Sequence, residues 1–151
     1  MITGVDILLM VSFDYPPPQP TNFNDVIITL ERTGCYGTCP IYELTISGEG
    51  NVTYKGEGFV NVTGTHTAQI TQEEVKELID EFYKIEYFSL KDSYEEYRVT
   101  DMPSTITSIT INGRTKTVRH YHGDKNAPKE LTELERKIDE ITNSKQWVEG
   151  E

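Results

Sequence analysis

The first half of the chain alternates hydrophobic and polar residues over short runs, a pattern typical of strands with one buried face. A Gly-Glu-Gly-Asn turn follows the second run, and Gly64 lies between the last two. We therefore predict an antiparallel meander whose last two runs form a hairpin. The five runs are residues 26–33, 41–47, 52–55, 59–62 and 66–70.

The hydrophobic period changes to that of an amphipathic helix after Thr71. Thr71 and Glu74 match a capping box, in which each side chain bonds the backbone amide of the other residue. Pro128 stands where a second helix is predicted to begin. Trp147 and Val148 are expected to fold back onto the core behind that helix. The two apolar stripes are Val75, Leu78, Ile79, Phe82 and Ile85, then Leu131, Leu134, Ile138 and Ile141.

Between the two helices, residues 105–111 and 114–122 are predicted to form a hairpin around Asn112-Gly113, a strong turn signal. A two-residue turn would pair Ile111 with Arg114. A three-residue loop with a bulge would instead bring threonines beside the isoleucines. We favour the bulged loop, because it keeps cations off the core face.

This order of elements predicts an α+β fold, with an antiparallel sheet and two amphipathic helices on one face. The 151 residues fit a single domain of ordinary size. We assign residues 24–151 to that domain. Residues 1–23 form an N-terminal arm that ends in a proline-rich spacer, because consecutive prolines favour a stiff polyproline conformation. Residues 1–20 are a candidate for self-association.

A net charge of −11 argues against nucleic acid as a partner, because phosphates repel an acidic surface. No run approaches the ~20 apolar residues that a membrane span needs. The stretch Val5–Val11 is broken by Asp6 and has no preceding Lys or Arg, so it is a poor signal peptide.

Both cysteines, Cys35 and Cys39, lie in one turn among glycines and a proline. Gly34 and Gly37 give the backbone the freedom that a short disulfide ring requires. We expect a structural disulfide contributing about 2 kcal/mol. Free thiols and a metal or redox role are the alternatives, although the Cys-x-x-x-Cys spacing and the strand after Pro40 fit a redox centre poorly.

His120 and His122 stand two residues apart, so a strand places them on one face. Such a pair can chelate zinc or copper, with His66 or the two cysteines as further ligands. Surface or edge-strand histidines without a metal are the preferred interpretation, and no cofactor is expected.

Acidic and aromatic residues cluster between residues 92 and 101. A calcium loop would need a central glycine, which this stretch lacks. A solvated acidic loop is the default, and a protein-recognition loop or a weak cation site is the alternative. The candidate binding residues are Asp92, Tyr94, Glu95, Tyr97 and Asp101.

The cysteine turn and several later segments together resemble a widespread prokaryotic family that is catalogued only as a domain of unknown function. The resemblance covers residues 26–148 and implies small extracytoplasmic or envelope proteins with no established activity. It adds no catalytic residue. The segments that carry it are Gly34–Ile46, Val52–Tyr54, Phe59–Gly64, Val75–Phe82, Phe88–Leu90, Val99–Ser104, Asn112–Gly113, Tyr121–Gly123, Leu131, Leu134–Glu135, Ile138–Asp139 and Trp147.

No nucleophile motif, oxyanion donor or phosphate-binding glycine loop accompanies the carboxylates in this sequence. We therefore expect a non-enzymatic domain, extracytoplasmic, that binds a protein or a cell-surface component. The alternatives are a cytoplasmic protein, and a metal-binding or thiol-redox role for the cysteine turn and the His-x-His strand.

Overall fold

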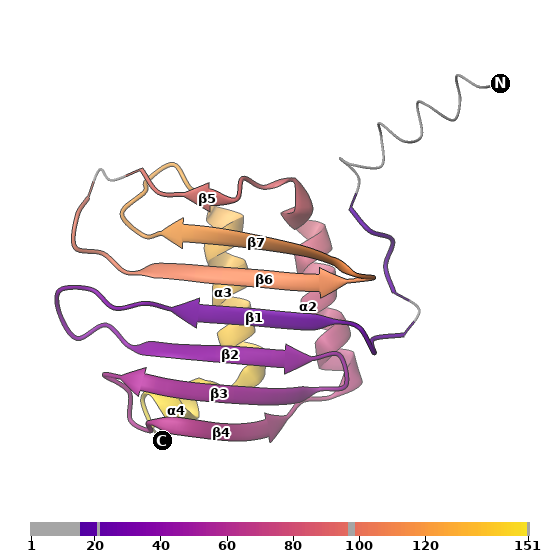
Figure 1. The fold of residues 1–151 in the computed structure, drawn as a ribbon, viewed down its shortest axis with the longest axis horizontal. Coiled ribbons are helices and arrows are strands. Elements are labelled where there is room, and N and C mark those ends of the chain that lie inside the picture. Colours follow the sequence, from indigo (N-terminus) through magenta and orange to yellow (C-terminus); the bar gives the residue numbers. More distant parts are fainter. Residues whose placement is uncertain (1–15, 21, 97–98, 151) are drawn as a thin grey trace.

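The computed structural model describes residues 16–20, 22–96 and 99–150, which contain a seven-stranded sheet with helices against one face (Figure 1). The strand order is β4-β3-β2-β1-β6-β7-β5, and all neighbours are antiparallel except β5 and β7. The strands are β1 (Ile27–Arg32), β2 (Ile41–Ser47), β3 (Asn51–Gly58), β4 (Gly64–Gln69), β5 (Ser93–Tyr94), β6 (Ser104–Ile111) and β7 (Arg114–Tyr121).

Two long helices, α2 (Gln72–Lys84) and α3 (Lys129–Thr142), lie against the same face of the sheet (Figure 1). A 3-10 turn, η1 (Tyr87–Ser89), follows α2, and the short helix α4 (Lys145–Val148) follows α3. The predicted α+β class is confirmed. No helix among the described residues is long and apolar enough to cross a membrane.

The core lies between the sheet and the two long helices. In the central strand β1, Ile28 and Leu30 are fully buried, whereas Ile27 on the opposite face is 45% exposed. The capping box at the start of α2 is present as predicted, with Thr71 and Glu74 bonding each other's amides. The buried stripes match the predicted positions, Val75, Leu78, Ile79 and Phe82 in α2 and Leu131, Leu134 and Ile138 in α3.

The face of the sheet turned away from the helices carries a row of hydroxyl side chains. Thr29 in β1 bonds Ser108 in β6, and such cross-strand pairs stabilise a sheet without a covering layer. This polar face explains why both helices gather on one side. In strand order, the residues that pair with one another along the row are Thr67, Thr53, Thr45, Thr29, Ser108 and Thr117.

The favoured bulged register at Asn112-Gly113 is wrong. Ile111 pairs with Arg114 across a two-residue turn whose central residues both have positive φ, as a type I′ turn requires. Lys116 and Arg114 therefore lie on the helix side, where each finds a partner. The Lys116 ammonium donates to the Leu90 carbonyl, and the Arg114 guanidinium lies 5.7 Å from the ring centroid of Phe88.

The predicted hairpin of residues 59–62 with 66–70 is also wrong. β4 pairs directly with β3, and residues 59–62 form no strand. The amides of Asn61 and Val62 instead donate to the carbonyls of Val148 and Trp147, at 2.8 and 2.9 Å. Trp147 is buried and stacks on Tyr54 with ring centroids 4.9 Å apart, so the predicted C-terminal plug holds this loop in place.

Part of the N-terminal arm rests against the domain. The Tyr83 hydroxyl of α2 donates to the Pro17 carbonyl at 2.6 Å, and Asn112 donates to the Pro18 carbonyl at 3.3 Å. The proline spacer is thus in contact with the fold. The apolar part of the arm, residues 1–14, lies outside the described residues, and its predicted role in self-association stays a prediction.

Candidate functional site

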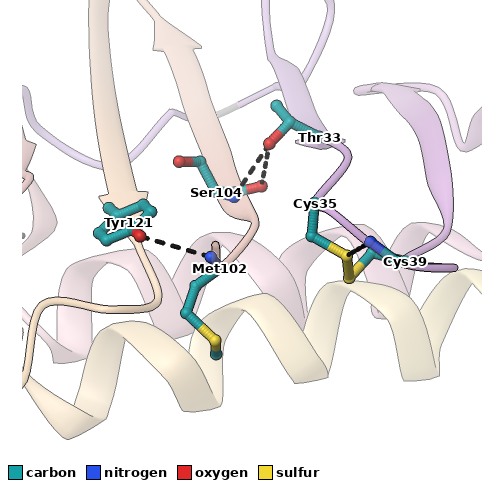
Figure 2. Close-up of a disulfide and its surroundings, with 7 residues drawn as sticks. Thr33, Cys35, Cys39, Met102, Ser104 and Tyr121 are labelled. Atoms are coloured by element: carbon teal, nitrogen blue, oxygen red, sulfur yellow. Dashed lines mark hydrogen bonds between the residues drawn. A yellow bond between two sulfur atoms is a disulfide. The ribbon is translucent and has the colours of Figure 1, made fainter. Parts of the chain in front are cut away.

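The loop between β1 and β2 holds both cysteines, and we call residues 34–40 the cysteine loop. The sulfur atoms of Cys35 and Cys39 lie at disulfide-bonding distance, 2.02 Å, with their Cα atoms 5.7 Å apart (Figure 2). The Gly37 amide donates to the Cys35 sulfur at 3.3 Å. This geometry agrees with the predicted covalent clip and leaves no cysteine of the chain as a free thiol.

Thr33 fixes the base of the cysteine loop by extending the pairing of β1 with β6. Its amide donates to the Ser104 carbonyl at 3.0 Å. Its hydroxyl accepts from the Ser104 amide at 2.9 Å and donates to the Ser104 carbonyl at 3.3 Å (Figure 2). The sheet therefore holds the base of the loop, and the bond between Cys35 and Cys39 closes the loop just above that base.

A second loop, residues 99–103, precedes β6 at the same end of the sheet, and we call it the Met102 loop. The Tyr121 hydroxyl, at the end of β7, accepts from the Met102 amide at 3.3 Å (Figure 2). It also donates to the Val99 carbonyl at 2.7 Å. Gly123 packs closely beneath it, because a β-carbon there would lie 2.1 Å from the Val99 carbonyl oxygen. The Met102 loop is thus positioned by the end of β7.

Gly123→Ala is expected to lower the free energy of unfolding by about 1–3 kcal/mol, because the added methyl group forces the Met102 loop outward. Chemical denaturation measures the loss. Gly37→Ala is the matched control in the cysteine loop, since its added carbon would meet its nearest neighbour, the Cys35 sulfur, at an ordinary 3.8 Å. Equal losses for the two variants would contradict the assigned role of Gly123.

The two loops border a hollow of about 430 Å³. Tyr36 on the cysteine loop is 90% exposed, and Val99 and Met102 on the facing loop are each 38% exposed. Asp101, a predicted binding residue, also lines the hollow and has a positive φ of 66°. The hollow is therefore lined by the exposed Tyr36 ring, the largely buried Tyr121 ring, the Met102 side chain and the Asp101 carboxylate.

The other predicted acidic residues face β7 instead of the hollow. Asp92 forms an ion pair with Lys116 at 2.9 Å, whose hydrogen bond and charge lower the pKa of Asp92. Glu95 lies 3.5 Å from Arg119. These carboxylates therefore neutralise the cations of the hairpin.

The aromatic members of that predicted cluster stay apart from the hollow as well. The Tyr94 hydroxyl accepts from the Lys91 amide at 3.1 Å, within its own segment. Tyr97 lies outside the described residues. The predicted binding cluster is thus divided, and of its described members Asp101 is the one that lines the hollow.

The histidine pair forms a second, buried cluster with a residue from α3. His120 and Glu135 are 4% and 1% exposed, and His120 Nδ1 lies 2.7 Å from Glu135 Oε2. His122 Nε2 lies 2.6 Å from the Thr105 hydroxyl and 3.8 Å from Glu135 Oε1. His66 belongs to β4 at the far edge of the sheet.

Burial controls the protonation of this cluster. It lowers the pKa of His122 to about 4, with the charges of His120 and Arg32 acting in the same direction. Burial also raises the pKa of Glu135, against the opposing hydrogen bond and charge of His120. His122 is consequently a neutral imidazole at pH 7.

A charged network adjoins the histidine cluster through Thr105. Arg32 donates to Thr105 at 2.9 Å and to Asp139 through two nitrogens at 3.1 and 2.7 Å. Asp139 also accepts from the hydroxyls of Tyr42 and Ser144 at 2.8 and 2.5 Å. β1, β2 and β6 are thus joined to α3 by polar contacts as well as by the apolar core.

Sequence reasoning missed Glu135 and Asp139 as parts of a site. A signal was present, because Glu135 falls four residues after Leu131 and three before Ile138, inside the buried stripe. A carboxylate on an apolar helix face indicates a partner across the core. What the sequence did not indicate was that His120 and His122 would be that partner.

Comparison with known protein families gives a match over the part of the chain that forms the sheet and the two long helices. A family model described as a domain of unknown function (DUF6438) matches residues 26–142. The chain belongs to this family. The DUF6438 match covers the whole sheet, the cysteine loop, the Met102 loop and the histidine cluster. No curated protein matches the chain.

Proposed function

We propose that this protein is a non-enzymatic binding domain that recognises a protein partner through the hollow between the cysteine loop and the Met102 loop. The observation that carries the proposal is the 90% exposure of Tyr36 on a loop closed by a disulfide. Aromatic rings are enriched among the residues that dominate binding energy at protein interfaces. A loop already held in one conformation loses less entropy on binding.

The setting of Tyr36 supports the same proposal. Met102 lines the hollow from the other loop, so an inserted side chain would meet apolar contacts from both loops. Asp101 adds a carboxylate at the rim, which favours a basic group on the partner. We place the binding event outside the cytoplasm, where disulfides persist.

Photo-crosslinking in the cells that produce the protein tests this proposal. A photoreactive residue at position 36 should yield a crosslinked protein of defined mass, and the same residue at position 27 should yield none. Ile27 is the matched control, because it is 45% exposed on β1 but on the opposite face of the strand from the core.

Competition makes the result specific. Excess purified wild-type protein should abolish the crosslink, whereas Tyr36→Ala should compete about 30-fold less well, the loss expected for an interface hot spot of ~2 kcal/mol. Equal crosslinking at positions 36 and 27, or equal competition by both proteins, would refute the proposal.

A further inference from the structure

The buried cluster of His120, His122 and Glu135 contains one polar atom without a hydrogen-bond partner among the described residues, Glu135 Oε1. This oxygen lies 3.8 Å from His122 Nε2. Burying a carboxylate oxygen without a hydrogen-bond partner lowers the stability of the folded protein. A positively charged group bound beside Glu135 Oε1 would remove that cost.

The hydrogen bonds of Thr105 indicate that His122 Nε2 is an acceptor too. Arg32 already donates to the Thr105 hydroxyl oxygen, which leaves the hydroxyl hydrogen to bond His122 Nε2 at 2.6 Å. His122, which directly follows β7, and Glu135 on α3 therefore bring two groups with lone pairs to 3.8 Å from each other. A cation bound at His122 Nε2 would displace the Thr105 hydroxyl hydrogen from that nitrogen.

We propose that His120, His122 and Glu135 form a binding site for a divalent transition-metal ion of the zinc class. Two imidazoles and one carboxylate are a donor set that suits zinc. The candidate ligand atoms of the three residues all lie within 4.8 Å of one another. His120 and Glu135 are held on β7 and α3, which are regular elements, so the site is largely preformed.

The distances fit a cation after a small adjustment. Ligand bonds of about 2.0–2.2 Å separate the donor atoms of a tetrahedral zinc site by roughly 3.3 Å. Two distances in the structure lie on either side of that value, 2.7 Å between His120 Nδ1 and Glu135 Oε2 and 3.8 Å between His122 Nε2 and Glu135 Oε1. Coordination at His120 Nδ1 moves its proton to Nε2.

The surrounding charges permit a dication. Arg32 is the cation that approaches the cluster, and its charge is compensated by Asp139 at 2.7 Å. The ligand set itself carries one negative charge, from Glu135. Access is through His122, whose side chain is 23% exposed. With three protein ligands, the ion would retain a position for water, as in open zinc sites.

Titration of the full chain with Zn²⁺ and Co²⁺, after treatment with a chelator, tests the proposal. The wild-type protein should bind one equivalent, give the intense visible bands of tetrahedral Co²⁺, and unfold at a higher temperature with Zn²⁺ present. His122→Ala and Glu135→Gln should each weaken binding by more than about 100-fold, because even an outer-shell partner is worth about 10–100-fold.

His66→Ala is the matched control, since His66 is an exposed histidine on β4. It should leave Zn²⁺ affinity unchanged. The melting temperature of each metal-free variant shows whether it folds. If Glu135→Gln does not fold, the His122→Ala variant alone tests the site. Failure of the wild-type protein to bind an equivalent of either metal would overturn the proposal. Undiminished binding by His122→Ala would overturn it as well, because the metal would then sit elsewhere.

Discussion

Replacing Asp139 with alanine is expected to lower the free energy of unfolding by about 3 kcal/mol. The substitution leaves the Arg32 guanidinium without its carboxylate partner and removes the acceptor of the Tyr42 and Ser144 hydroxyls. Breaking a fully buried pair costs about 3–5 kcal/mol. The lower end applies here, because the Arg32 and Asp139 side chains remain 24% and 21% exposed. Urea or guanidinium denaturation measures the change.

Glu140→Ala is the matched control for Asp139→Ala. Glu140 is the next residue of α3 and pairs with Arg136 at 2.6 Å, but these side chains are 55% and 62% exposed. An exposed pair of this kind contributes about 0.5 kcal/mol or less. Similar losses of unfolding free energy for Asp139→Ala and Glu140→Ala would show that the Arg32 network contributes no more to stability than an exposed ion pair.

Acidification is expected to destabilise the wild-type protein more than a His122→Gln variant. The unfolded chain protonates His122 near pH 6.5, whereas the folded protein does so only near pH 4. Between these values the unfolded state binds more protons, so stability falls as pH falls through this window. A shift of this size corresponds to up to about 3 kcal/mol.

Thermal or urea unfolding at several pH values from 7.5 to about 4 measures this effect. The stability difference between wild type and His122→Gln should shrink steadily as the pH falls. Glutamine preserves a polar side chain beside Thr105 but does not titrate. Parallel curves for the two proteins would show that folding does not depress the pKa of His122.

Local patterns in the sequence were sufficient for most elements of the fold. The capping box at Thr71 and the apolar stripes of α2 and α3 depend on residues three or four positions apart, so a single helix encodes them. The clip between Cys35 and Cys39 is similarly local. The predicted hairpin register was wrong because the actual register depends on Lys116 reaching Leu90 and Asp92, between η1 and β5, and no local pattern reveals that contact.

The candidate sites show the same division. The sequence by itself determined the alternation that puts His120 and His122 on one face, and the apolar stripe that carries Glu135 into the core. Only the tertiary structure decided that these residues meet, because α3 packs against the face of the sheet on which the His120 side chain lies. It also decided that the cysteine loop faces the Met102 loop, since β1 pairs with β6 although about 70 residues separate them. Contacts between distant segments depend on how whole elements pack, and a sequence pattern records only the face that each element buries.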